Sequence, residues 1–353
     1  MKKKKKVFFF LPGSVGGAER MTVTIAKMLP LDEFIVKFVI VDKNRGDIEN
    51  FIPHNYEVLF VPIKNIWMGT CLKVAKVLRT QKADFAFCSL GHLAPHILLG
   101  AKMVGGIKTI IRNDIHVSTT KWYRKLSEKI TYPWAYVLIS QQEEMRQDHI
   151  DTLGVDPNKI IVIHNPIDTK TIDAKTKDCE SPFVLGVDNI NYVCVGRFSP
   201  VKGQDILAKA FAIVAEKSKN AHLYFIGKYE DNEYFKFVNK IVDDASLSER
   251  VHFIGYDSNP YRWMKYSDCF VLPSRREGLP NALVEAMYLG KPVVASDCLP
   301  VISRMMDCGR NGYIVPVDNP QAMAKAMLNA LQLTDLRMCY VPGNESDFVG
   351  LFR

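Results

Sequence analysis

The chain has 353 residues, of which 48% are hydrophobic and 24% are charged. This length exceeds one ordinary core and suits two globular domains of roughly 150–180 residues each. The apolar runs fall short of the roughly 20 residues that span a bilayer, which argues against a membrane-spanning helix. The eight cysteines show no C-x-x-C pair and no metal-like spacing with histidine. We therefore expect reduced thiols and a cytoplasmic location.

The net charge of +8 is concentrated in the first half of the chain. Residues 1–180 hold 27 Lys and Arg against 19 Asp and Glu, whereas residues 181–353 hold 19 of each. Two interpretations stay open. The first half either attracts an anionic partner, such as a membrane surface or a lipid pyrophosphate, or carries a solvated basic surface and a lysine tail. Because no nucleic-acid-binding motif accompanies the basic residues, no nucleic-acid partner is expected.

In the first half, short β-branched and aromatic runs alternate with stretches of helical period. The expected strands are Lys6–Leu11, Phe34–Val41, Glu57–Val61, Asp84–Ser89, Thr109–Arg112, Ala135–Ser140 and Ile160–His164. The expected helices include Ala18–Leu29, Thr70–Thr80 and Gln142–Thr152. The first strand follows a lysine run, but its apolar stretch ends at Pro12-Gly13 and is too short for a secretory signal.

The second half repeats this alternation. Its expected strands are Tyr192–Arg197, Leu223–Gly227, Val251–Gly255, Cys269–Pro273, Val293–Ser296 and Tyr313–Val317. Its expected helices include Gln204–Glu216, Glu233–Ala245, Asn281–Leu289 and Pro320–Leu331. Between the halves, residues 167–189 are rich in Asp, Lys and Thr and lack clear periodicity, as is typical of a linker.

This alternation predicts an α/β protein with two doubly wound, Rossmann-like domains. We expect an N-terminal domain at residues 1–168, a linker at 169–190 and a C-terminal domain at 191–353. In open parallel sheets, ligands bind beyond the carboxyl ends of the strands. The loops that follow the strands are therefore the places to look for chemistry.

The first such loop runs from Pro12 to Gly17 and opens a helix at Ala18-Glu19-Arg20. Glycines such as Gly16 and Gly17 let the backbone approach a phosphate, and a helix N-terminus offers unpaired N–H groups. A tight turn would need glycine for steric reasons alone, so the pattern leaves both interpretations open. It matches neither the G-x-G-x-x-G nor the Walker pattern, which argues against NAD and ATP.

The second loop reads G-R-F-S-P-V-K-G from Gly196 to Gly203. Arg197 and Lys202 lie five residues apart at the end of an expected strand. Arginine offers forked hydrogen bonds and lysine a compact charge, so the two can grip a diphosphate. The alternative is that both are solvated surface cations.

The third loop and the helix after it read P-S-R-R-E-G-L-P-N-A-L-V-E from Pro273 to Glu285. Proline suits the first helical position, so Pro280 predicts a helix whose N-cap, Leu279, offers no side-chain acceptor. The N–H groups of the first turn then need water or a ligand. Glu277 precedes this helix. Glu285 lies in an apolar stretch and either finds a partner, such as a ribose, or turns out to solvent.

Together these segments resemble the family-4 retaining glycosyltransferases. The resemblance rests on E-G-L-P-N-A-L-V-E at 277–285, G-R-F-S-P-V-K-G at 196–203 and G-G-A-E-R at 16–20, in this order along nearly the whole chain. It implies a GT-B fold, in which two Rossmann-like domains face each other across a cleft, and a reaction without metal or cofactor. The sequence agrees in having no Asp-x-Asp motif.

The resemblance also implies roles for individual residues. Arg197 and Lys202 look like the diphosphate clamp, and Glu285 looks like the ribose contact. Glu277 resembles the glutamate that contacts the donor sugar. The remaining donor-binding candidates are backbone positions near the donor, namely Gly278, Leu279, Pro280 and Asn281 beside Glu277, Gly255 beside the base, and Gly16 and Gly17 over the phosphates.

The chain departs from the family pattern at two points. Members carry a cleft histidine after the fifth N-domain strand, but here the position falls on Asn113 or Asp114. Either His116 reaches the cleft, or Arg112 and Asp114 take over its role. Members also end in a helix that crosses back onto the N-domain. The sequence after Leu333 does not predict a long helix, which leaves a shortened, altered or missing element.

The expected activity is transfer of a hexose or N-acetylhexosamine from a nucleotide-diphosphate sugar, with UDP favoured, to a hydroxyl of a saccharide or lipid-linked saccharide. The context that the resemblance implies is bacterial surface-polysaccharide synthesis, at the inner face of the membrane if the basic half contacts lipid. Three alternatives stay open. They are a GDP-mannose-dependent mannosyltransferase, a UDP-sugar epimerase of similar fold, and a non-catalytic GT-B subunit.

Overall fold

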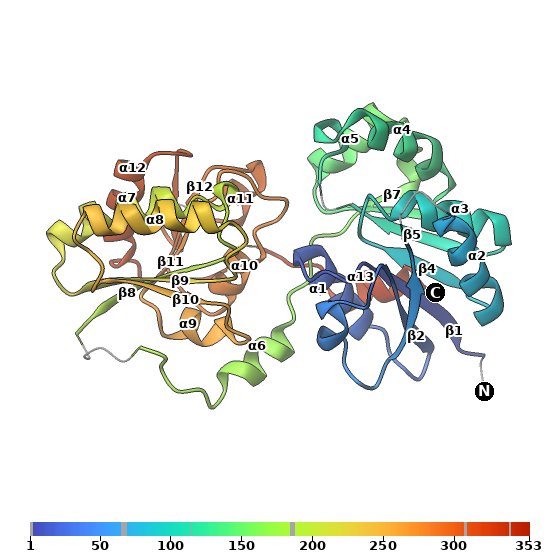
Figure 1. The fold of residues 1–353 in the computed structure, drawn as a ribbon, viewed down its shortest axis with the longest axis horizontal. Helices are drawn as coiled ribbons and strands as arrows, with labels where there is room; N and C mark the ends of the chain where they lie inside the picture. The colour runs from blue at the N-terminus through green and yellow to red at the C-terminus, as the bar shows by residue number, and fades with distance from the viewer. Residues whose placement is uncertain (1–2, 65–68, 114, 184–187, 307–308, 339) are drawn as a thin grey trace. The chain divides into compact units, whose positions relative to one another are not determined.

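The computed structural model describes residues 3–64, 69–113, 115–183, 188–306, 309–338 and 340–353. The chain divides into two compact units (Figure 1). Unit 1 comprises Met1–Pro166 together with Pro342–Arg353, and unit 2 comprises Ile167–Val341.

The described residues of unit 1 form a seven-stranded parallel sheet of order β3-β2-β1-β4-β5-β6-β7. The strands are β1 (Lys5–Leu11), β2 (Phe34–Asp42), β3 (Glu57–Pro62), β4 (Phe85–Cys88), β5 (Lys108–Arg112), β6 (Val137–Ser140) and β7 (Ile160–Val162). The helices are α1 (Gly17–Lys27), α2 (Thr70–Gln81), α3 (Ala94–Val104), α4 (Trp122–Thr131), α5 (Glu143–Leu153) and α13 (Glu345–Gly350).

Strand β1 shows why this sheet lies between two layers of helices. Its residues from Val7 to Leu11 are fully buried. Because side chains alternate along a strand, Phe8 and Phe10 enter one hydrophobic cluster, whereas Val7, Phe9 and Leu11 enter another. A strand that is apolar on both faces needs cover on both, which parallel sheets with crossover helices provide.

The described residues of unit 2 form a six-stranded sheet of order β10-β9-β8-β11-β12-β13, again parallel. The strands are β8 (Ile190–Val195), β9 (Ala221–Ile226), β10 (Val251–Gly255), β11 (Cys269–Leu272), β12 (Val293–Ser296) and β13 (Gly312–Val315). The helices are α6 (Thr169–Thr176), α7 (Gln204–Lys217), α8 (Asn232–Asp244), α9 (Pro260–Tyr266), α10 (Asn281–Tyr288), α11 (Pro300–Met305) and α12 (Pro320–Ala330). All the strands expected from the sequence in both halves are confirmed.

The C-terminal segment differs from the sequence expectation. The sequence grouped residues 191–353 together, but residues 342–353 pack with unit 1. Helix α13 begins with a capping box between Asn344 and Asp347. Phe348 and Phe352 are fully buried in the core of unit 1, and the Phe352 ring centroid lies 5.5 Å from that of Phe85. The segment after Leu333 therefore includes a short helix that packs on unit 1 through two aromatic side chains one turn apart.

The segment between the two sheets is more ordered than its composition suggests. Residues 169–176 form helix α6, which packs against α9 of unit 2. The Asp168 carboxylate caps this helix by accepting a hydrogen bond from the Thr171 N–H at 3.1 Å. The linker expected at 169–190 is thus partly helical, and the Asp-x-x-Thr spacing was the local signal for it.

Candidate functional site

The carboxyl ends of four neighbouring strands of unit 2 lie at one edge of its sheet, because β10, β9, β8 and β11 are adjacent and parallel. The loops that follow these strands pack closely against one another, and at two contacts a glycine lies directly against a backbone carbonyl. A Cβ on Gly203, whose φ is +69°, would stand 2.1 Å from the Pro273 carbonyl oxygen. A Cβ on Gly227 would stand 1.9 Å from the Gly196 carbonyl oxygen. Only glycine permits these approaches, so the loops form one close-packed surface.

Lys202 and Glu277 meet at this edge although they are 75 residues apart. The Lys202 Nζ lies 2.7 and 2.8 Å from the two carboxylate oxygens of Glu277. The Ser274 hydroxyl donates to Glu277 Oε1 at 2.6 Å. The Glu277 side chain is 7% exposed and that of Lys202 is 25% exposed. An ammonium has three N–H donors and Glu277 engages at most two, so Lys202 keeps the capacity to donate to a ligand.

Arg197 extends from the same loop as Lys202 but is held more loosely. Its Nη1 lies 2.9 Å from both carboxylate oxygens of Glu230, and the two side chains are 57% and 41% exposed. Such an exposed ion pair contributes only about 0–1 kcal/mol, so Arg197 can exchange Glu230 for an anionic ligand at little cost. The backbone is better fixed, because the buried Gln204 amide donates to the Arg197 carbonyl at 2.9 Å.

Arg275 joins the two loops, and nothing in the sequence singled it out. Its guanidinium donates to both carboxylate oxygens of Asp205 at 2.8 Å and to the Pro200 carbonyl at 2.6 Å. Tyr234 donates to Asp205 Oδ1 at 2.6 Å. Burial alone would raise the pKa of Asp205, but the hydrogen bonds from Arg275 and Tyr234 outweigh burial and lower it. Asp205 therefore stays ionised and anchors Arg275.

The helix after this loop begins at Asn281, the start of its expected range, but its N-cap is not the residue expected. Asn281 is the first residue of α10 and Pro280 is its N-cap, so the prediction that Leu279 caps the helix was wrong. The expectation that the helix has no side-chain cap is confirmed, since no side chain accepts a hydrogen bond from its N-terminal N–H groups. Gly278 and Leu279 connect Glu277 to this helix end. A ligand anion could therefore meet both the helix terminus and the Lys202–Glu277 pair.

The other two donor-binding candidates of unit 2 lie on α10 and at the end of β10. Glu285 is half-buried, and the Tyr261 hydroxyl lies 3.5 Å from its Oε1. Gly255 ends β10 with a φ of +76°, and a Cβ there would stand 3.8 Å from the Tyr229 hydroxyl oxygen. Glu285 thus has a polar neighbour in its apolar helix, as its setting requires.

In unit 1, the glycine loop lies at the start of α1. Gly16 is the N-cap of this helix and Gly17 its first residue. A Cβ on Gly16 would stand 2.5 Å from Glu19 Oε2. Glu19 is buried, and its carboxylate folds back toward the helix N-terminus, where negative charge is favourable. A side chain at Gly16 would require the Glu19 carboxylate, the end of a flexible side chain, to move aside.

The residues around the expected histidine position take different places. Asp114 lies outside the described residues. His116 is part-exposed, and its Nδ1 lies 3.9 Å from Asp148 Oδ2. The Asp148 carboxylate also accepts hydrogen bonds from the Val117 and Ser118 N–H groups, so it organises this loop. Arg112 is buried and donates to Asn165, which gives it a structural contact inside unit 1.

Asn113 joins a buried network rather than pointing outward. Its Nδ2 lies 2.7 Å from His149 Nε2, and the Ser140 hydroxyl lies 2.9 Å from His149 Nδ1. Tyr132 donates to Asn113 Oδ1 at 3.1 Å. Because an amide NH₂ can only donate, His149 Nε2 is the acceptor and Nδ1 carries the proton of a neutral ring. This network was not predicted from the sequence.

Acid should weaken unit 1 through His149. Burial lowers the pKa of His149 from 6.5 to about 4. The stability contributed by the neutral ring is fully present above pH 6.5 and is lost as the pH falls toward 4, by up to about 3 kcal/mol. Urea unfolding of the wild type and of His149→Gln, between about pH 7 and 4, checks this. The variant should lose less stability over this range, and equal losses would refute the assignment.

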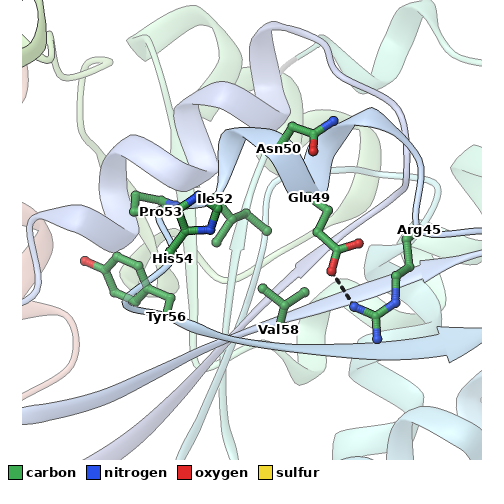
Figure 2. Close-up of a pocket in the computed structure, with 8 residues that line it drawn as sticks. All are labelled: Arg45, Glu49, Asn50, Ile52, Pro53, His54, Tyr56 and Val58. Atoms are coloured by element: carbon green, nitrogen blue, oxygen red, sulfur yellow. Dashed lines mark hydrogen bonds and ion pairs between the residues drawn. The ribbon is translucent and has the colours of Figure 1, made fainter.

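A hollow in the surface of unit 1 involves none of the predicted site residues (Figure 2). Its volume is about 460 Å³, and it is lined by Arg45, Glu49, Asn50, Ile52, Pro53, His54, Tyr56 and Val58. Arg45 and Glu49 form an ion pair across one turn, so the two charges nearest the hollow satisfy each other. The hollow therefore offers no unbalanced charge to a phosphate.

Two protein-family models match the chain, and both describe glycosyltransferases. The model for Glycosyltransferase Family 4 matches residues 15–171, and that for Glycosyl transferases group 1 matches residues 182–342. The chain is 24% identical over 95% of its length, and over 92% of the relative's, to the N-acetylgalactosamine-N,N'-diacetylbacillosaminyl-diphospho-undecaprenol 4-alpha-N-acetylgalactosaminyltransferase of Campylobacter jejuni. It is 26% identical, over 80% of the chain and 76% of the relative, to the UDP-Gal:alpha-D-GlcNAc-diphosphoundecaprenol alpha-1,3-galactosyltransferase of Escherichia coli.

The fold has a counterpart among solved structures. Anabaena Alr3699/HepE in complex with UDP and glucose superposes with a TM-score of 0.77 at 19% identity, covering 99% of this chain and 94% of that one. The order of the strands, the two family models and the relatives agree with one another. The chain therefore belongs to the glycosyltransferases of GT-B fold whose two halves the family-4 and group-1 models describe.

Proposed function

We propose that this chain is a retaining glycosyltransferase that moves a hexose or N-acetylhexosamine from a UDP-sugar to a hydroxyl of a lipid-linked saccharide. The observation that carries this proposal is the meeting of Lys202 with Glu277 beside Arg197, at the carboxyl edge of the sheet of unit 2. The name of the Escherichia coli relative specifies a UDP donor and a diphosphoundecaprenol acceptor, and that of the Campylobacter relative a diphospho-undecaprenol acceptor. Surface-polysaccharide synthesis at the inner face of the membrane is the setting that suits such an acceptor.

In this proposal, unit 2 holds the donor. Arg197 releases Glu230 and grips the diphosphate with its fork, while Lys202 donates its remaining hydrogen to a phosphate oxygen. Glu285 binds the ribose, and the backbone near Gly255 contacts the base. The residues from Gly278 to Asn281 line the donor, and the positive end of α10, which no side chain caps, lies beside them. Positive charge from Arg197 and Lys202 stabilises the leaving diphosphate, so no metal is required.

The proposed reaction breaks the bond between the anomeric carbon and the phosphate oxygen and forms one to the acceptor oxygen on the same face. The departing phosphate oxygen takes the acceptor proton, so charge and atoms balance. Glu277 orients the donor sugar rather than attacking it, because both of its oxygens are engaged by Lys202 and one also by Ser274. Gly16, Gly17 and His116 of unit 1 are assigned to the phosphate loop and the acceptor side, and Asp114 stays a candidate there.

A thermal-shift panel of nucleotide diphosphates tests the donor assignment. UDP at about 100 times its Kd should stabilise the folded chain by about 2.7 kcal/mol, because it binds the native state alone. GDP and ADP at the same concentration should give no comparable rise in Tm. A rise with GDP only would replace the proposal by the GDP-mannose alternative. A UDP-sugar converted to its epimer without any acceptor would replace it by the epimerase alternative.

A further inference from the structure

Helix α4 of unit 1 turns its apolar side outward. Trp122, Tyr123, Leu126 and Ile130 are 75%, 45%, 52% and 54% exposed. At about 100° per residue these four side chains fall within one sector of roughly 100°. They form a continuous apolar stripe along the helix. Amphipathic helices of globular proteins ordinarily turn such a stripe toward the core.

The opposite side of α4 is polar, and it is this side that packs on unit 1. Arg124 Nε donates to Glu128 Oε1 at 2.7 Å, and the Glu128 side chain is fully buried. The Tyr132 hydroxyl lies 3.4 Å from the same oxygen. A Cβ on Gly91 would overlap the Arg124 guanidinium, so the backbone there lies directly against this ion pair. The fold thus holds α4 by its charged side and has no packing use for the exposed stripe.

Lysines line one flank of the stripe. Lys121, Lys125 and Lys129 are spaced one turn apart and fall in the sector between the apolar stripe and the buried side. The only acidic residue of the helix is the buried, paired Glu128. The exposed surface of α4 is therefore apolar along one strip and purely cationic along the next.

The neighbouring helix also carries exposed apolar and basic side chains. α3 packs against α4, and its Leu99, Lys102 and Met103 are exposed. Figure 1 shows α4 on the outside of unit 1, next to α5. The loop before α4 follows β5 and contains His116, so α4 begins close to the carboxyl edge of the sheet of unit 1.

We propose that α4 is an interfacial helix that lies in the plane of an anionic phospholipid surface. Trp122 and Tyr123 have the amphipathic rings that favour the headgroup level, Leu126 and Ile130 enter the acyl boundary, and the lysines contact anionic headgroups. Charge complementarity selects this occupant over a second copy of the chain, which would bring two lysine strips together. The biological role of this docking rests on the proposed function. Docking would bring the carboxyl edge of the unit 1 sheet, near His116, close to a lipid-linked acceptor.

Vesicle sedimentation tests the docking. The protein is mixed with vesicles of neutral phosphatidylcholine or with vesicles that contain about 30 mol% phosphatidylglycerol. The wild type should bind the anionic vesicles preferentially and lose binding in high salt. Trp122→Ser/Leu126→Ser should lower the partition coefficient at least about tenfold, because apolar burial is removed. Lys125→Gln/Lys129→Gln should lower it about tenfold or more on anionic vesicles only.

Helix α8 of unit 2 supplies the matched control. Phe237 is 50% exposed, and Lys236 and Lys240 flank it. Phe237→Ser and Lys236→Gln/Lys240→Gln should leave vesicle binding within about twofold of the wild type. All variants should keep the Tm shift with UDP, which reports on unit 2 independently of lipid. Loss of that shift in the wild type would overturn the donor assignment and leave the docking result standing.

Two outcomes would overturn the docking proposal. One is equal vesicle binding by the α4 variants and the wild type. The other is a wild type that ignores anionic vesicles but forms a dimer in sedimentation velocity that the Trp122→Ser/Leu126→Ser variant cannot form.

Discussion

Lys202→Ala should lower kcat by about 10²–10³-fold, because in the proposed mechanism it removes one preorganised donor from the leaving diphosphate. The substitution also removes the cation that Glu277 contacts through both carboxylate oxygens. Arg197→Ala should lower turnover by a similar factor, since Arg197 is the second cation of the same loop. Initial rates of sugar transfer from the UDP-sugar, at saturating donor, measure both effects.

Two comparisons separate this effect from misfolding. Lys236→Ala removes a lysine that pairs with Glu233 on the surface of α8, so it should leave turnover unchanged. Lys202→Arg retains a positive charge but changes its geometry, and it should restore part of the rate. Lys202→Ala without ligand should still unfold cooperatively, at a lower Tm than the wild type, because the Glu277 carboxylate loses its cation. Near-normal turnover by a folded Lys202→Ala variant would refute the clamp assignment.

Phe352→Ala should destabilise unit 1 by about 3–5 kcal/mol, the usual cost of removing a buried aromatic ring. Phe352 is fully buried, and its ring lies among those of Phe9, Phe34 and Phe85. Calorimetry should show a lower Tm for the transition of unit 1 and little change for that of unit 2. Val341→Ala, at a side chain 75% exposed, is the control and should cost under about 0.5 kcal/mol.

A cost below about 1 kcal/mol for Phe352→Ala would mean that the C-terminal segment is only loosely attached to unit 1. Phe348→Ala provides an independent check, because Phe348 is buried in the same cluster from the preceding turn. The two residues belong to one hydrophobic cluster, so the double variant need not show the sum of the two costs.

The strands were predictable from sequence because a parallel sheet buries both faces of each strand. The run from Val7 to Leu11 has no polar residue, and no amphipathic helix has that pattern. Helix α13 was not predictable in the same way. Its apolar residues are few, and its stability comes from the pocket that Phe348 and Phe352 fill, which exists only once the sheet has formed.

The loops of the candidate site were predictable from the sequence, but the contacts between their side chains were not. The strand order places Arg197, Lys202 and Glu277 at one edge, and the resemblance named them. That Lys202 meets Glu277, whereas Arg197 meets Glu230, depends on side-chain directions set by long-range packing. Arg275 lies inside the predicted motif, but its role needs Asp205 and Tyr234, which come from α7 and α8.

The stripe on α4 shows a different limit. Sequence periodicity reveals an amphipathic helix but does not say which side the core takes. Here the buried Glu128 and Arg124 decide it, and a helical wheel alone would have assigned Trp122 and Leu126 to the core.

The return of the chain to unit 1 has a consequence for biosynthesis. Unit 2 is one continuous segment, Ile167–Val341, whereas unit 1 is completed only by residues 342–353. During synthesis, the first 166 residues emerge well before Phe348 and Phe352, because the whole of unit 2 lies between them in the sequence. Unit 2 can therefore finish folding before unit 1 does, the reverse of the usual N-terminal-first order. The part of the unit 1 core that Phe348 and Phe352 fill is therefore covered only after unit 2 has been synthesised.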